Sequence, residues 1–89
     1  WAVSEKEAVK VQEYHLDSNM HVNNGQYVQI ASAYLPGDIR FNRMRVEYRN
    51  QARLGDVMVP VVYTKENTCM VALCDTENKP YAVIEASVG

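Results

Sequence analysis

Hydrophobic and polar positions follow two different periods along this chain of 89 residues. Near the start, Val9 and Val11 alternate with Lys10 and Gln12 before Tyr14. A period of two is typical of a half-buried β-strand. The pattern therefore predicts a first strand over about residues 8–16.

A helical period follows a polar, turn-forming segment over residues 17–25. The apolar positions spaced i, i+3, i+4 and i+7 are Tyr27, Ile30, Ala31 and Tyr34. Either Asn23 or Asn24 can cap the free backbone amides at the start of such a helix. Pro36-Gly37 is expected to end it after about three turns.

From Ile39 onward the sequence predicts only strands. Ile39 and Phe41 lie in one phase of the alternation, whereas Met44 lies in the other, so we expect a bulge or twist near residues 42–43. Further strands are expected over about residues 57–64, 68–74 and 81–88. Pro60 lacks an amide donor, which favours an edge strand or a bulge there.

These elements predict one small domain over residues 1–89. A chain of this length can bury a single core only, and no internal repeat or low-complexity tract divides it. The order β, α and then four strands joined by short connections predicts a two-layer α+β domain, in which the helix packs on a curved antiparallel sheet.

The amino-acid composition argues against two classes of binding partner, nucleic acids and membranes. Nine basic and eleven acidic side chains give a net charge of −2, which provides no overall field for binding nucleic acid or an anionic membrane. No apolar run reaches the ~20 residues that cross a bilayer, and the first residues resemble no leader peptide. We therefore expect a soluble, cytoplasmic piece of a longer polypeptide, with no membrane insertion.

The two cysteines do not indicate a redox or metal site. Cys69 and Cys74 are separated by four residues, a spacing that matches neither a CxxC pair nor a metal knuckle. Buried, reduced thiols are the expected state. We expect no metal and no cofactor.

The polar segment before the helix contains the candidate chemistry. Asp17, Asn19 and His21 occupy alternate positions, so in an extended backbone all three side chains project to the same side. Free amides at the helix start, around Asn24 and Gly25, are suited to a carbonyl oxygen that acquires negative charge. Hydrolysis of an activated ester needs such a carboxylate, an orienting amide, a proton donor and an oxyanion site.

A structural explanation fits the same residues. Asp and Asn before a helix usually form turns and caps, and a lone histidine such as His21 is often only a surface residue. Spacing alone leaves both interpretations open.

Two motifs resemble those of a known family. Residues 16–27 read Leu-Asp-Ser-Asn-Met-His-Val-Asn-Asn-Gly-Gln-Tyr, which is similar to the Leu-Asp-x-Asn-x-His-Val-Asn-Asn-x-x-Tyr signature of acyl-acyl-carrier-protein thioesterases. Residues 46–56 resemble that family's second motif, Glu-Tyr-Arg-x-Glu-(Cys or Ala)-x-x-x-Asp. The resemblance implies a hotdog fold, a long central helix wrapped by a curved sheet, and places this chain in the C-terminal half of a tandem pair.

The resemblance also implies an activity and partners. The substrate would be a fatty acyl-acyl-carrier-protein, hydrolysed to the free fatty acid. Asp17 would polarise water or act as nucleophile, Asn19 would orient the water or the carbonyl, and His21 would assist proton transfer. The partners would be acyl carrier protein and a second hotdog domain, either the N-terminal half or another copy.

The chain departs from the family in its second motif. Gln51 stands where the catalytic glutamate is expected, and Ala52 stands where plant members have cysteine. A glutamine cannot take a proton, so a general base at this position would be lost. Three functions therefore stay open: an acyl-carrier-protein thioesterase, an acyl-CoA thioesterase that acts as a homodimer, and a non-catalytic acyl-binding half.

Arginines are concentrated around the second motif. The five that fall within fourteen residues are Arg40, Arg43, Arg45, Arg49 and Arg53. An arginine-rich strand face is often simply solvated and paired with acids such as Glu47 or Asp56. Guanidinium groups also match the phosphate of a phosphopantetheine arm or an acidic carrier protein, for which Arg49 and Arg53 are the candidates.

Overall fold

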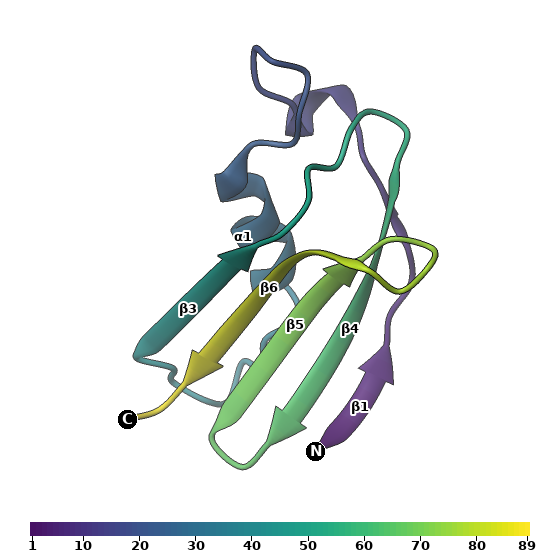
Figure 1. The fold of residues 1–89 in the computed structure, drawn as a ribbon. Helices are drawn as coiled ribbons and strands as arrows, with labels where there is room; N and C mark the ends of the chain where they lie inside the picture. Colours follow the sequence, from purple (N-terminus) through teal and green to yellow (C-terminus); the bar gives the residue numbers. More distant parts are fainter.

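One α-helix and six strands form the fold, which a computed structural model describes over residues 1–89 (Figure 1). In chain order the elements are β1 (Ala2–Glu5), β2 (Val9–Lys10), a 3₁₀ turn (Glu13–His15), α1 (Asn24–Ser32), β3 (Arg43–Tyr48), β4 (Val57–Lys65), β5 (Thr68–Cys74) and β6 (Pro80–Ser87). No helix is long and apolar enough to span a membrane.

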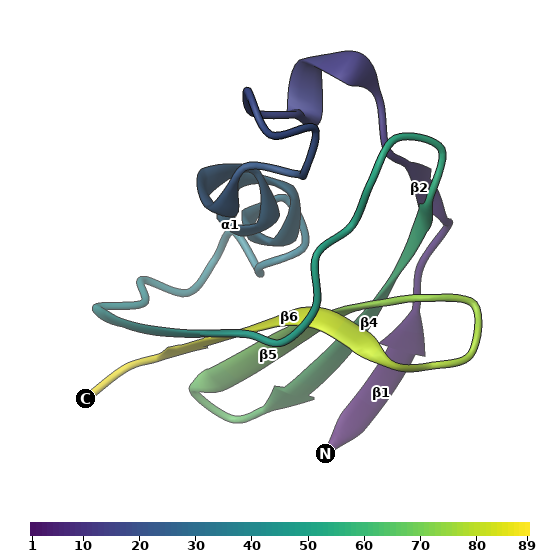
Figure 2. The same cartoon turned by 45° about the horizontal axis from the view of Figure 1, so that its top comes forward.

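The strands form one antiparallel sheet with the order β1-β4-β5-β6-β3, and β2 pairs with β4 beyond the end of β1. Figure 2 shows that α1 lies on one face of this sheet, so the predicted two-layer α+β arrangement is confirmed. The two edges are β1 and β3.

The main core lies between α1 and the sheet. Tyr27 and Ala31 of the predicted helix face are buried, and Ile30 and Tyr34 pack against the same cluster. Sheet residues that share this cluster include Met58, Val62, Cys69, Val71, Leu73 and Ile84. A smaller cluster of Val61, Ala72 and Cys74 lies on the opposite face of the sheet. The helical spacing thus identified the buried face of α1 correctly.

The first predicted strand, residues 8–16, is wrong in extent. Pairing with β4 stops at Lys10, and a 3₁₀ turn follows, in which the Gln12 N–H donates to Nδ1 of His15 at 2.9 Å. An unpredicted strand, β1, lies upstream. Its residues are all exposed, so it carries no buried face that an alternating pattern could reveal.

Two further strand predictions need correction. The expected strand from Ile39 begins only at Arg43, because residues 39–42 are irregular. Pro60 lies in β4, which is an interior strand rather than an edge. Its carbonyl accepts from the Lys6 N–H at 2.8 Å, in the gap between β1 and β2. The missing amide donor therefore faces a break in the neighbouring strand, where no partner needs it.

Buried cysteine thiols and a buried tyrosine hydroxyl make the stability of the fold sensitive to alkaline pH. Desolvation by burial raises the pKa of the Cys69 and Cys74 thiols above their ordinary value of 9.0, and that of the Tyr81 hydroxyl above 10.0. The folded state binds these protons more tightly than the unfolded state, so their stabilisation is complete below about pH 9 and is lost as the pH rises through the raised values.

We therefore expect the melting temperature to fall between pH 9 and pH 11, as measured by circular dichroism. A variant with both Cys69→Ala and Cys74→Ala should lose the earlier part of that fall and keep the part due to tyrosines. A melting temperature that rises over this range would contradict the assignment.

Candidate active site

The segment that carries Asp17, Asn19 and His21 is a tight turn rather than an extended strand. Leu16 and Val22 form an isolated antiparallel bridge. Inside it, the Asp17 N–H donates to the His21 carbonyl at 2.9 Å and the Met20 N–H donates to the Asp17 carbonyl at 3.1 Å. Alternate side chains of a turn do not share one direction, so the expectation based on extended backbone is wrong.

The Asp17 carboxylate holds this turn together. Its Oδ1 atom accepts from the Asn19 N–H at 2.9 Å and from the His21 N–H at 3.3 Å. This is the turn-forming role that the structural explanation foresaw. The other oxygen, Oδ2, has no hydrogen-bond partner in the chain, which leaves one lone-pair face of the carboxylate for another ligand. No hydrogen bond joins the side chains of Asp17, Asn19 and His21.

The start of α1 offers one free amide, not two. Asn23 is the N-cap, and its Oδ1 accepts from the Gly25 N–H at 2.9 Å. The expectation of a free amide at Gly25 is therefore wrong, because the cap occupies it. The Asn24 N–H has no acceptor in the chain and is the donor left at this helix end. A Cβ atom at Gly25 would lie 3.3 Å from the Asn23 side-chain oxygen, so glycine allows the tight cap.

The two motifs meet in space although about thirty residues separate them in sequence. The Val22 N–H donates to the Ala52 carbonyl at 3.0 Å, and His21 and Arg53 form an isolated antiparallel bridge. Figure 1 shows the 3₁₀ turn, the loop that follows it and the connection from β3 to β4 at the same end of the molecule. The backbone thus places Ala52 and Arg53 beside the turn that carries Asp17.

Tyr27 belongs to the candidate site through its hydroxyl, whereas the helical spacing predicts it only as part of the buried helix face. The ring is 1% exposed, and its Oη accepts from the Ala52 N–H at 2.8 Å. Burial raises the pKa of the Tyr27 hydroxyl above 10.0; the Ala52 N–H opposes this shift, and the charges of Asp56 and Asp17 add to it. A tyrosine rather than a phenylalanine at a buried helix position was the available signal, because a buried hydroxyl needs a partner.

A pocket of about 500 Å³ lies against the start of α1. Its lining residues are Asn24, Tyr27, Tyr48, Arg49, Asn50 and Gln51. The Tyr48 hydroxyl donates to the Asn24 carbonyl at 3.4 Å across it. Three of the sequence-predicted residues, Asn24, Arg49 and Gln51, are therefore brought together. Asp17, Asn19, His21, Gly25 and Arg53 line none of the five principal pockets.

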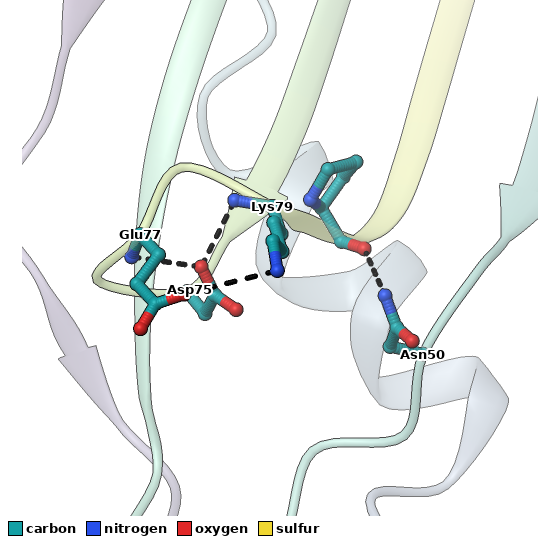
Figure 3. Close-up of polar contacts among 5 residues, drawn as sticks. Asn50, Asp75, Glu77 and Lys79 are labelled. Atoms are coloured by element: carbon teal, nitrogen blue, oxygen red, sulfur yellow. Dashed lines mark hydrogen bonds and ion pairs between the residues drawn. The ribbon is translucent and has the colours of Figure 1, made fainter.

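The segment after β3 is anchored to β6. The Arg49 and Asn50 N–H groups both donate to the Tyr81 carbonyl, at 2.8 and 3.2 Å. Figure 3 shows the Asn50 side chain donating to the Pro80 carbonyl, at 3.0 Å, beside the turn held by Asp75. This anchoring fixes the Gln51 wall of the pocket relative to the sheet.

The arginines differ in their partners. The Arg49 guanidinium contacts the Glu47 carboxylate at 3.1 Å, which confirms the predicted pairing for this residue. Both side chains are more than half exposed, so the pair contributes little to stability. Arg53 is exposed and its guanidinium forms no ion pair; its backbone N–H donates to Oδ2 of Asp56 at 2.9 Å, and its carbonyl accepts from the Asp56 N–H at 3.0 Å.

Acidic, thiol and imidazole side chains do not gather into a metal centre. No group of three or more of them could hold a metal ion. Cys69 and Cys74 are buried and free, on opposite faces of the sheet.

The chain matches one family model, the acyl-ACP thioesterase C-terminal domain, over residues 2–86. No curated protein matches the chain.

Solved structures share the fold at low sequence identity. An acyl-ACP thioesterase from Bacteroides thetaiotaomicron superposes with a TM-score of 0.84 at 17% identity, covering 94% of this chain and 37% of that one. The SAV2348 protein of Staphylococcus aureus, solved with CoA, gives 0.81 at 17% identity over 96% and 73% of the two chains. The probable thioesterase YbaW of Escherichia coli gives 0.75 at 17% identity over 93% and 78%. The hotdog fold is thereby confirmed, and the chain spans just over a third of the Bacteroides enzyme.

Proposed function

Because the chain belongs to the family of acyl-ACP thioesterase C-terminal domains, we propose that it contributes the catalytic half of an enzyme that hydrolyses fatty acyl-acyl-carrier-protein. Water adds to the thioester carbonyl, the carbon–sulfur bond breaks, and the products are the free fatty acid and the carrier thiol. Release of the acid would end chain elongation.

The observation that carries this proposal is the meeting of the two motifs. The Val22–Ala52 hydrogen bond and the His21–Arg53 bridge hold the turn that carries Asp17 against the segment that carries Gln51. The backbone segments that carry a carboxylate, an imidazole and carboxamides thus meet near the start of the helix, where the Asn24 amide is free. These are the groups that ester hydrolysis needs.

We assign the roles as follows. Asp17 activates water or attacks the carbonyl through its unpaired Oδ2 atom, while its Oδ1 atom stays bound to two backbone amides. Asn19 orients the water or the carbonyl, and His21 assists proton transfer. Gln51 orients rather than accepts a proton, because its carboxamide has no basic site at neutral pH.

The Asn24 N–H supports the developing oxyanion, with Gly25 allowing the close cap beside it. This role requires a single donor to polarise the thioester carbonyl at the helix start, where the helix dipole favours negative charge. The pocket of about 500 Å³ against Asn24 and Gln51 provides space for the group next to the thioester.

A second hotdog domain is the proposed structural partner, either a preceding half or another copy. Edge strand β3 leaves one row of backbone groups unpaired, and such an edge readily pairs with another strand. Met44 and Tyr48 of β3 are 50% and 45% exposed, on the same side as Val46, which is partly buried against the core. Their burial against a neighbour would complete the apolar surface beside the pocket.

One experiment distinguishes the proposed function from two alternatives. An acyl-CoA thioesterase would work as a homodimer on a different thiol carrier. A non-catalytic acyl-binding half is suggested by Gln51, which stands where a base is expected.

The experiment compares the hydrolysis of acyl groups of several lengths attached to carrier protein and to CoA. Each substrate is tested with the chain alone and with the chain joined to a preceding hotdog half. Light scattering records the oligomeric state of both forms. We expect higher kcat/KM with carrier protein. A preference for CoA by a homodimer would favour the first alternative. Acyl binding without turnover in both forms would favour the second.

The arginines near the second motif predict a salt effect. Replacing both Arg49 and Arg53 with Ala should raise KM for the carrier-protein substrate about tenfold and flatten its dependence on ionic strength, because exposed guanidinium groups attract an acidic partner over about a Debye length. The matched control is Arg40→Ala with Arg43→Ala, which removes two positive charges before and at the start of β3. Unchanged salt dependence would exclude this docking role.

A further inference from the structure

The backbone of Ala52 is held from two sides. Its N–H donates to the Tyr27 hydroxyl at 2.8 Å, and its carbonyl accepts from the Val22 N–H at 3.0 Å. Ala52 is fully buried and lies outside the regular sheet. A side chain of α1 therefore replaces the strand neighbour that this amide would otherwise need.

Gln51 depends on this arrangement for its position. The Ala52 side chain fills the core, whereas the neighbouring Gln51 is exposed and lines the pocket with Asn24. Tyr27 forms part of the same pocket and rises from the first turns of the helix that Asn24 begins. A shift of the Ala52 peptide would carry Gln51 away from the helix start.

We propose that the Tyr27 hydroxyl is a positioning group, which sets the place of Gln51 relative to the start of α1 by fixing the Ala52 amide. The inference rests on the proposed function for its catalytic consequence. Tyr27 itself does not touch the reacting atoms. It fixes the backbone of residues 51–53, and this backbone determines where the Gln51 carboxamide meets the substrate.

The geometry explains why a hydroxyl is needed here. A phenylalanine would fill the same volume and keep the ring contact with Tyr48, whose centroid lies 6.1 Å away. It would leave the buried Ala52 N–H without an acceptor. The segment would then move to find water or another partner, and only the polar wall of the pocket would be displaced.

The test is Tyr27→Phe, with Tyr34→Phe, two residues beyond the end of α1, as the matched control. Tyr34 packs against the core, but its hydroxyl makes no hydrogen bond within the chain. We expect Tyr27→Phe alone to speed hydrogen exchange at the Ala52 amide and to lower kcat about tenfold with little change in KM, since a small misplacement of a catalytic constellation is costly.

A double-mutant cycle separates positioning from general loosening of the fold. In a Gln51→Ala background, Tyr27→Phe should lower kcat by less than about twofold, because the group that it positions is gone. An equal loss in both backgrounds, or unchanged protection of the Ala52 amide, would overturn the inference. Inactivity of the unaltered chain toward every thioester, both alone and joined to a preceding hotdog half, would instead overturn the proposed function, and the Ala52 amide would still report whether Tyr27 fixes it.

Discussion

Replacing Asp17 with Asn is expected to lower the turnover number for acyl thioester hydrolysis by about 10²–10⁴-fold, the range typical for loss of a general base. The asparagine oxygen can still accept from the Asn19 and His21 N–H groups, which Oδ1 of Asp17 binds at 2.9 and 3.3 Å. The turn should therefore persist. What is lost is the charge on Oδ2, and with it the ability to take a proton from water or to attack the carbonyl. Steady-state kinetics with acyl-carrier-protein, together with binding of the acyl chain, measure both properties.

The chain contains a close control for this substitution. Asp75 also stabilises a turn through one carboxylate oxygen, which accepts from the Glu77 and Lys79 N–H groups at 2.8 and 2.9 Å (Figure 3). Asp75→Asn repeats the same change of charge in the turn between β5 and β6. Turnover should be unaffected there. If Asp17→Asn also retains full turnover, Asp17 is a turn-forming residue only, and the hydrolase mechanism given above fails.

The elements that the sequence predicted well are those whose burial repeats with a fixed period. Strand β5 occupies residues 68–74, as the turn-forming residues 65–67 and 75–80 on either side of it predict, and Cys69, Val71 and Leu73 face the core. The helix was placed because Tyr27 and Ala31 repeat at i and i+4, and its start followed from the asparagine cap. In both cases residues close in sequence carry the signal: an apolar period for the helix and flanking turns for the strand.

The failures come from contacts that sequence spacing does not encode. The 3₁₀ turn is closed by the Gln12 N–H, which donates to Nδ1 of His15, a cap that lies outside the usual Ser, Thr, Asp and Asn set. The exposed strand β1 exists because β4 offers a free edge. Both depend on partners, so an apolar pattern in the segment itself could not identify them.

The same contrast between local sequence patterns and tertiary contacts holds for the candidate site. Its residue types were predicted from two motifs, but their arrangement was not. The extended backbone assumed for residues 17–21 is a turn, and the amide assumed to be free at Gly25 is capped. The motifs are linked by the Val22–Ala52 and Tyr27–Ala52 hydrogen bonds, which join residues far apart in sequence. The residue types in a motif thus indicate its chemistry, whereas the tertiary contacts that position those residues cannot be read from the motif.

Replacing Gln51 with Glu is expected to raise the turnover number by about 10²-fold, since it supplies a second proton acceptor at the pocket wall. Gln51 is exposed, and the two side chains have nearly the same shape, so the introduced carboxylate is hydrated and should not unfold the chain. It would lie in the same pocket as Asn24, where the thioester carbonyl is proposed to bind. The added activity should disappear below about pH 4, where a glutamate of ordinary pKa becomes protonated.

The control for charge alone is Gln29→Glu, which makes the same exchange at an exposed position of α1 that lines a different pocket. It should leave turnover unchanged. If Gln51→Glu also leaves the rate unchanged while Asp17→Asn abolishes it, Asp17 is sufficient as the base and the glutamine is a working variant of the motif. If Gln51→Glu lowers the rate, a second carboxylate opposes the charge on Asp17, and the carboxamide is then the group that this active site requires.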